Sequence, residues 1–128
     1  MTKTVHAPIS AGELIDKITI LQIKESEFTD EVKLAHVRNE LRELNKLVTE
    51  LNANVVPEME ELRKVNETIW YNEDKARTFS PNNWTAVQAF DIAEIAMTTY
   101  AANTRRAQIK QIINKKCNST IVEAKSYT

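Results

Sequence analysis

The spacing of apolar residues along the chain predicts four long helices. Apolar positions recur at helical intervals over residues 10–27, 30–51, 58–77 and 84–116. Turn-forming residues separate these segments at 28–30, 52–57 and 79–83. One Gly and three Pro in 128 residues are too few for a chain built from strands and turns. We therefore predict an all-α protein, an antiparallel bundle of about four main helices that forms a single domain over residues 1–128.

The last helical segment carries two apolar faces that do not line up. The earlier face ends at residue 101, and the later face begins after Asn103. At 100° per residue the two faces differ by roughly half a turn, so a straight helix would have to bury opposite sides in its two halves. We predict a break or kink near Asn103, with Asn118 ending the last helix and an extended tail docked on the bundle. The earlier face comprises Phe90, Ala93, Met97 and Tyr100, and the later one Ile109, Ile112 and Ile113.

The first two helices carry more apolar surface than one packing face requires. The first, which a capping box of Ser10 and Glu13 opens, is apolar on two sides. The second has a heptad seam that runs from Leu34 to Leu51. A helix that is apolar on two sides is either central in the bundle or shared with a second subunit. We predict self-association, as a dimer, through the first or the second helix.

Segment 58–77 contains the leading candidate site and is predicted to be the central helix. Asn66, Glu73 and Arg77 fall inside its apolar arc, and Trp70 closes the edge of that arc. Polar groups on a core-facing stripe need partners, because each unmet group costs on the order of 1–3 kcal/mol. The stripe is either a structural polar layer or a pocket in which Arg77 holds an anion beside Trp70. Asp16 lies among isoleucines in the same way, and its candidate partners are Arg77, Arg106 and Lys125.

The composition argues against a disulfide-rich protein, a metalloprotein, a membrane protein and a nucleic-acid-binding protein. A single cysteine, Cys117, excludes a disulfide framework, and His6 and His36 lie in unrelated stretches, so we expect no metal site and no cofactor. No apolar run approaches the ~18 residues of a membrane span, and the N-terminus lacks a signal-peptide core, so a cytoplasmic protein is expected. Residues 101–128 hold six basic residues and one acidic residue. No aromatic residues interleave the basic run, which argues against nucleic acid.

Two enzyme classes are weaker matches. The acid pairs Glu58 with Glu61 and Asp91 with Glu94 resemble those of all-α, magnesium-dependent nucleotide pyrophosphohydrolases. The second pair has the wrong order, and chance pairs are expected among eighteen acids. A small helical mutase would need several convergent arginines, and the spacing of arginines here is not distinctive. The sequence assigns no catalytic residue.

Nearly the whole chain resembles an uncharacterised family of small helical proteins, a domain of unknown function. The similarity lies in the motif from Ser10 to Leu21, in residues 33–38, in the positions from Val65 to Lys110, and in the closing motif from Ile121 to Tyr127. The resemblance implies a bacterial protein whose gene often lies near genes for surface-polysaccharide and glycosyl-transfer machinery. It implies no activity. The segment after Arg77 departs from the family pattern.

The motif residues of this resemblance coincide with the polar positions on the helical faces. We therefore expect one polar network in which the first helix, the 58–77 helix and the tail meet. Its members would be Asp16, Glu73, Arg77, Arg106 and Lys125. The leading interpretation is a non-catalytic cytoplasmic binding or accessory protein linked to glycan assembly, with a protein or a small anion as partner. The alternative is an enzyme or sensor that binds a phosphorylated or nucleotide-sugar ligand along Asn66 to Arg77.

Overall fold

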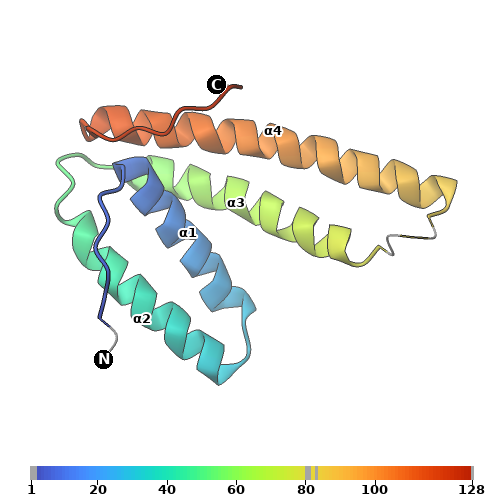
Figure 1. The fold of residues 1–128 in the computed structure, drawn as a ribbon, viewed down its shortest axis with the longest axis horizontal. Helices are drawn as coiled ribbons and strands as arrows, with labels where there is room; N and C mark the ends of the chain where they lie inside the picture. Colours follow the sequence, from blue (N-terminus) through green and yellow to red (C-terminus); the bar gives the residue numbers. More distant parts are fainter. Residues whose placement is uncertain (1–2, 80–81, 83, 128) are drawn as a thin grey trace.

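The four predicted helices are confirmed. The computed structural model describes residues 3–79, 82 and 84–127, and no strand occurs among them. In chain order the helices are α1 (Ala11–Glu27), α2 (Glu31–Val48), α3 (Val56–Arg77) and α4 (Ala86–Lys116). Figure 1 shows α3 and α4 side by side as a long antiparallel pair, with α1 against one half of it and α2 on the far side of α1. The protein is an all-α bundle.

The central helix is α1, and not α3 as the sequence pattern suggests. Among the described residues α1 packs against each of the other three helices, whereas α2 packs against α1 alone. The two apolar stripes of α1 suit this position, because a helix that is apolar on two sides can pack against more than one neighbour. The hydrophobic core lies around α1, where α1 packs against the other three helices. Its fully buried apolar side chains are Ile15, Ile18, Ile23, Leu62, Ile109 and Ile113.

Side chains cap the helix ends largely as the sequence predicts. Ser10 Oγ accepts from the Glu13 N–H at 3.1 Å. The predicted capping box is only half formed, because the Glu13 carboxylate turns to Lys110 instead. A complete capping box occurs at α4, between Thr85 and Gln88. Asn118 follows the end of α4 with a φ of 52°, the left-handed conformation that asparagine tolerates after a helix.

Of the break or kink predicted near Asn103, the break is wrong. Helix α4 continues without interruption from Ala86 to Lys116, so Asn103 caps nothing. The prediction assumed that both apolar faces are buried. Phe90 is 70% exposed and Met97 66% exposed, whereas Ile109 and Ile113 are fully buried. One continuous helix therefore buries Ile109 and Ile113 in its second half and leaves the earlier apolar face open in its first half.

Candidate functional site

A buried ion pair links α1 to α4. The Asp16 side chain, 2% exposed, accepts from Arg106 Nε at 2.8 Å and from Arg106 Nη2 at 2.5 Å. Asn66 of α3 donates to Asp16 Oδ1 at 2.9 Å and to Thr19 Oγ1 at the same distance. The Thr19 hydroxyl donates to the Asp16 carbonyl. Three helices thus contribute to one polar cluster inside the core.

Every polar group of this cluster is satisfied. No buried side-chain nitrogen or oxygen lacks a hydrogen-bond partner in the part of the chain that the structure describes. The hydrogen bond to Asp16 raises the pKa of Arg106, against the opposing effect of burial. A bidentate, hydrogen-bonded pair is the arrangement in which a protein interior tolerates charge. The cluster therefore fixes how α1, α3 and α4 meet.

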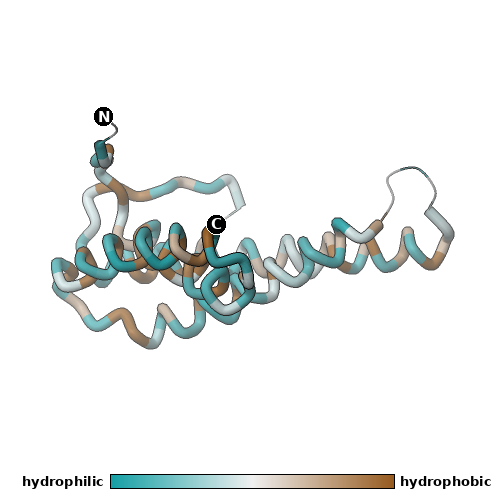
Figure 2. Tube along the Cα trace, turned by 90° about the horizontal axis from the view of Figure 1, so that it is seen from below, coloured by the Kyte–Doolittle hydropathy of each residue, from teal (hydrophilic) through white to brown (hydrophobic). Residues whose placement is uncertain are grey.

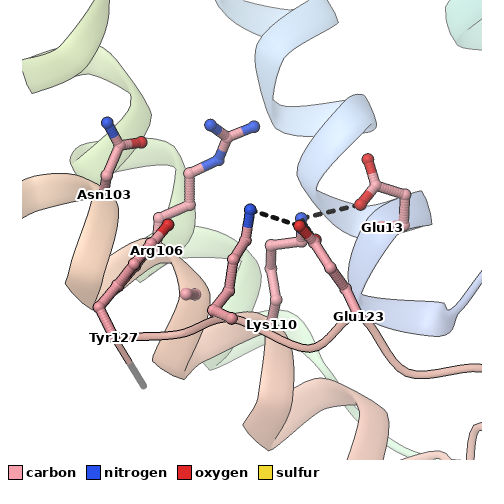
Figure 3. Close-up of a pocket in the computed structure, with 8 residues that line it drawn as sticks. Glu13, Asn103, Arg106, Lys110, Glu123 and Tyr127 are labelled. Atoms are coloured by element: carbon pink, nitrogen blue, oxygen red, sulfur yellow. Dashed lines mark hydrogen bonds and ion pairs between the residues drawn. The ribbon is translucent and has the colours of Figure 1, made fainter.

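A polar pocket of about 200 Å³ lies next to this ion pair, where α1, α4 and the C-terminal tail meet. Figure 3 shows the Lys110 ammonium between two carboxylates, Glu13 of α1 and Glu123 of the tail. Lys110 Nζ lies 2.8 Å from Glu13 Oε2 and 3.0 Å from Glu123 Oε2. Burial lowers the pKa of Lys110, but these two hydrogen bonds outweigh it and the pKa is raised. The pocket is lined by Glu13, Asn103, Arg106, Ala107, Lys110, Glu123, Lys125 and Tyr127.

The tail closes one side of the pocket with charged groups of both signs. Lys125 forms an ion pair with Glu123, and its ammonium lies 5.9 Å from the centre of the Tyr127 ring. Hydrogen bonds from Lys125 and Lys110 lower the pKa of Glu123. The hydrogen bond to Glu123 in turn raises the pKa of Lys125. Both partners hold their charges firmly at neutral pH.

Gly12 allows α4 to approach the start of α1 closely. A Cβ at this position would lie 2.5 Å from the Lys110 carbonyl oxygen, so no larger residue fits without displacing backbone. The Gly12 N–H donates to Asn114 Oδ1 at 2.6 Å, and the Ala11 N–H donates to Ser119 Oγ at 2.8 Å. These contacts hold the start of α1 against α4 and against the first residues of the tail.

The structure unites only part of the predicted network. Asp16, Asn66 and Arg106 form the buried cluster, and Lys125 lies at the neighbouring pocket. Glu73 and Arg77 do not join them. The Arg77 side chain is 74% exposed and lies near Glu73 and Asp74 of its own helix, at 3.9 and 3.8 Å. Trp70 packs against the Phe28 ring, with 6.1 Å between the ring centres, as part of the apolar packing.

Sequence reasoning missed the role of Lys110 and Glu123. Lys110 follows Arg106 by four residues, so both side chains leave the same face of α4. That spacing was the available signal for a cationic face, but it could not show which acids cover it. Glu123 lies in a tail without periodicity, and only the fold brings it to α4.

The first of the two acid pairs that resembled a metal site, Glu58 and Glu61, forms ion pairs instead. Glu58 is largely buried and forms an ion pair with Lys116, the last residue of α4. Glu61 binds Arg105, again on α4. The four charges therefore attach α3 to α4, and no group of three or more metal-binding side chains occurs among the described residues.

Comparison with known proteins identifies the family. In residues 3–79, 82 and 84–127 no helix combines the length and apolarity that a membrane crossing requires. Neither the curated proteins nor the solved structures contain a match to the chain. Residues 5–128 match the model described as "Family of unknown function (DUF6165)". The resemblance predicted from the sequence motifs is thereby confirmed, and the chain belongs to this family of unknown function.

Proposed function

We propose that this protein binds a small anionic ligand, without catalytic activity of its own, at the pocket between α1, α4 and the tail. One observation carries the proposal. Lys110 of α4 and Lys125 of the tail converge on the single carboxylate of Glu123 at this pocket. A ligand carboxylate or phosphate presents the same acceptor oxygens and would take the place of Glu123. The chain's own acid thus stands where the ligand's anion would bind.

The directions of the pKa shifts in the pocket favour binding of an anion over acid–base catalysis. General acid–base catalysis is most efficient when a pKa lies near the working pH. Here the pKa values of Lys110 and Lys125 are raised and that of Glu123 is lowered, each away from neutrality. Groups with such fixed charges suit electrostatic recognition of an anion better than proton transfer.

The size of the pocket limits what it can hold. Its volume of about 200 Å³ is smaller than the roughly 300–1,000 Å³ typical of sites for drug-sized ligands. It would therefore hold one charged group, with the remainder of a larger molecule outside. A role in glycan assembly, which the resemblance implies, makes a nucleotide sugar the larger ligand to test. A cytoplasmic location is part of the proposal, supported by the single free cysteine.

Calorimetric titration with inorganic phosphate, acetate and a nucleotide sugar tests the proposal. We expect saturable binding that weakens at least about ten-fold, or 1.4 kcal/mol, in Lys125→Gln. Glu123→Gln should tighten binding, because the competing carboxylate is removed. Lys115→Gln, an exposed change on the same helix, is the matched control and should have no effect.

Two outcomes would contradict this site. Equal binding by the wild-type protein and Lys125→Gln would remove the pocket from consideration. Binding lost in Arg77→Ala but retained in Lys125→Gln would favour the alternative site along Asn66 to Arg77. If none of the three probes produces binding heat, small-anion binding is rejected and a protein partner becomes the remaining hypothesis.

A further inference from the structure

The outer halves of α3 and α4 form an arm without a third helix. Over residues 72–77 of α3 and 86–101 of α4 no residue is buried. Figures 1 and 2 show this arm projecting beyond α1 and α2, with apolar positions along it. Most helical stability in proteins comes from packing an apolar face against a neighbour. The arm has such a face, and α1 and α2 do not cover it.

One stripe of α4 in the arm has the spacing of a coiled-coil seam. Its members follow one another at intervals of four and three residues, which places them on one face of the helix. Phe90, Met97 and Tyr100 are 70%, 66% and 65% exposed. The seam consists of Ala86, Phe90, Ala93, Met97, Tyr100 and Thr104.

The seam is almost free of charge, unlike the solvated face of α2. Only Asp91 and Glu94 are charged between Ala86 and Thr104, and both lie to one side of the seam. The 18 residues of α2 include seven charged residues, although α2 also packs against a single neighbour. A helix face that remains in water is normally charged or polar. The composition of α4 therefore indicates a partner on this face.

An apolar groove borders the seam on its other side. It lies between α3 and α4, has a volume of about 250 Å³, and is lined by Ala76, Ile92, Ile95, Ala96 and Tyr100 together with three polar residues. Tyr100 belongs to both the groove and the seam. The arm thus presents an exposed aromatic side chain at Phe90 and, between α3 and α4, an apolar recess whose α4 residues lie between Ile92 and Tyr100.

We propose that two copies of this chain dimerise through their arms, α4 antiparallel to α4, with the two-fold axis between the two seams, at the level midway between Ala93 and Met97. This register pairs Phe90 with the partner's Tyr100 and Met97 with the partner's Ala93. Each contact of this register is made twice, once from each copy, as an isologous interface requires. The two arms together make a four-helix bundle, in which each pair of helices gains the missing layer.

The exposed area and the pairing both favour a second copy. Phe90, Met97, Tyr100 and the flanking Val87, each about two-thirds exposed, present on the order of 500 Å² of the roughly 800 Å² per partner in a standard interface. The small residues between them extend the patch. Large residues meet small ones or other aromatics in the antiparallel register, which allows the close packing of knobs into holes. The same stripe serves both sides, so no second surface is needed.

Sedimentation equilibrium of the full chain at about 100 µM tests the inference, at the concentration where a weak dimer would still form. We expect a dimer whose dissociation constant rises at least about 30-fold in Phe90→Glu and in Met97→Glu, the loss typical of a central interface residue. Both side chains are exposed within one chain, so circular dichroism should show an intact fold. Val32→Glu, an exposed apolar position on α2, is the matched control and should dimerise normally.

Disulfide trapping tests the register. In a Cys117→Ala background, Ala93→Cys with Met97→Cys should form an intermolecular disulfide under mild oxidation, whereas a pair at Val32 and Ala35 on α2 should not. A monomer at all concentrations, or a dimer that is unchanged by Phe90→Glu and Met97→Glu, would overturn the proposal. Disruption by Val32→Glu instead would place the interface on the second helix.

Discussion

At the scale of single residues, Asp16 shows what the chain specifies and what it leaves open. An acid flanked by isoleucines on an amphipathic helix must find a partner, so its burial is predictable from the pattern. Its partner is not. Arg77, Arg106 and Lys125 were all candidates, and Arg106 is 90 residues away in the chain. Only the packing of α1 against α4 selects it, with Asn66 of α3 completing the cluster.

Removal of Asp16 should therefore cost much of the stability. We expect Asp16→Ala to lower the free energy of unfolding by about 3 kcal/mol, because the partly buried Arg106 loses its carboxylate. Urea unfolding of single and double variants provides the measurement. Asp16→Ala and Arg106→Ala should couple by more than about 1 kcal/mol, because each removes the same ion pair.

Arg77→Ala supplies the control for this cycle. Its guanidinium is exposed and near acids of its own helix, so its effect should add to that of Asp16→Ala within about 0.5 kcal/mol. Additivity between Asp16 and Arg106, or strong coupling between Asp16 and Arg77, would contradict the observed network.

At the scale of elements, α4 shows how a correct periodicity leads to a wrong boundary. The two apolar faces of this helix do differ by about half a turn, as the sequence indicates. The break was inferred from the assumption that all apolar faces are buried in one chain. The described structure exposes the first face, so the 31-residue helix needs no break. Its ends, in contrast, follow from the local capping chemistry of Thr85 and Asn118.

Proline at residue 104 distinguishes a continuous helix from a broken one. In a continuous α4, Thr104→Pro removes a hydrogen bond and clashes with the preceding turn, which should cost about 3 kcal/mol or more. If Asn103 capped a new helix, proline would occupy its first position and be tolerated. Ala86→Pro, at the first position of α4 after the Thr85 cap, is the control and should change stability by less than about 1 kcal/mol. Thermal unfolding of both variants measures the difference, and equal stability would favour the break.

At the scale of the whole molecule, the chain divides into a packed body and a thin arm. The core lies where α1 meets α3 and α4, and the outer half of the α3–α4 pair has no buried residue. Local opening is easiest where few apolar contacts hold the backbone. A monomer should therefore open first at the arm, whereas dimerisation through the α4 seam would protect it.

Amide hydrogen exchange can resolve this difference along one helix. In Phe90→Glu we expect exchange over residues 86–101 to accelerate at least about ten-fold relative to the wild-type protein at high concentration. Exchange over 107–116 should be unchanged, because the core that holds this part of α4 does not involve the arm. The wild-type protein diluted below its dissociation constant should match the variant. Uniform acceleration along α4 would mean that the substitution unfolds the body as well.

The sequence by itself determined the four helices, the Ser10 cap of the first helix and the all-α class, because these depend on periodicity and on contacts within a few residues. It also marked Asp16 and Asn66 as polar positions that need partners and gave Arg106 as one candidate partner of Asp16. Tertiary structure decided which partners they have, that Glu73 and Arg77 stay outside, and that Glu123 meets Lys110 at a pocket. It also decided which of two apolar faces of α4 is covered. These outcomes depend on which helices lie side by side, and a periodic pattern specifies a face without specifying its neighbour.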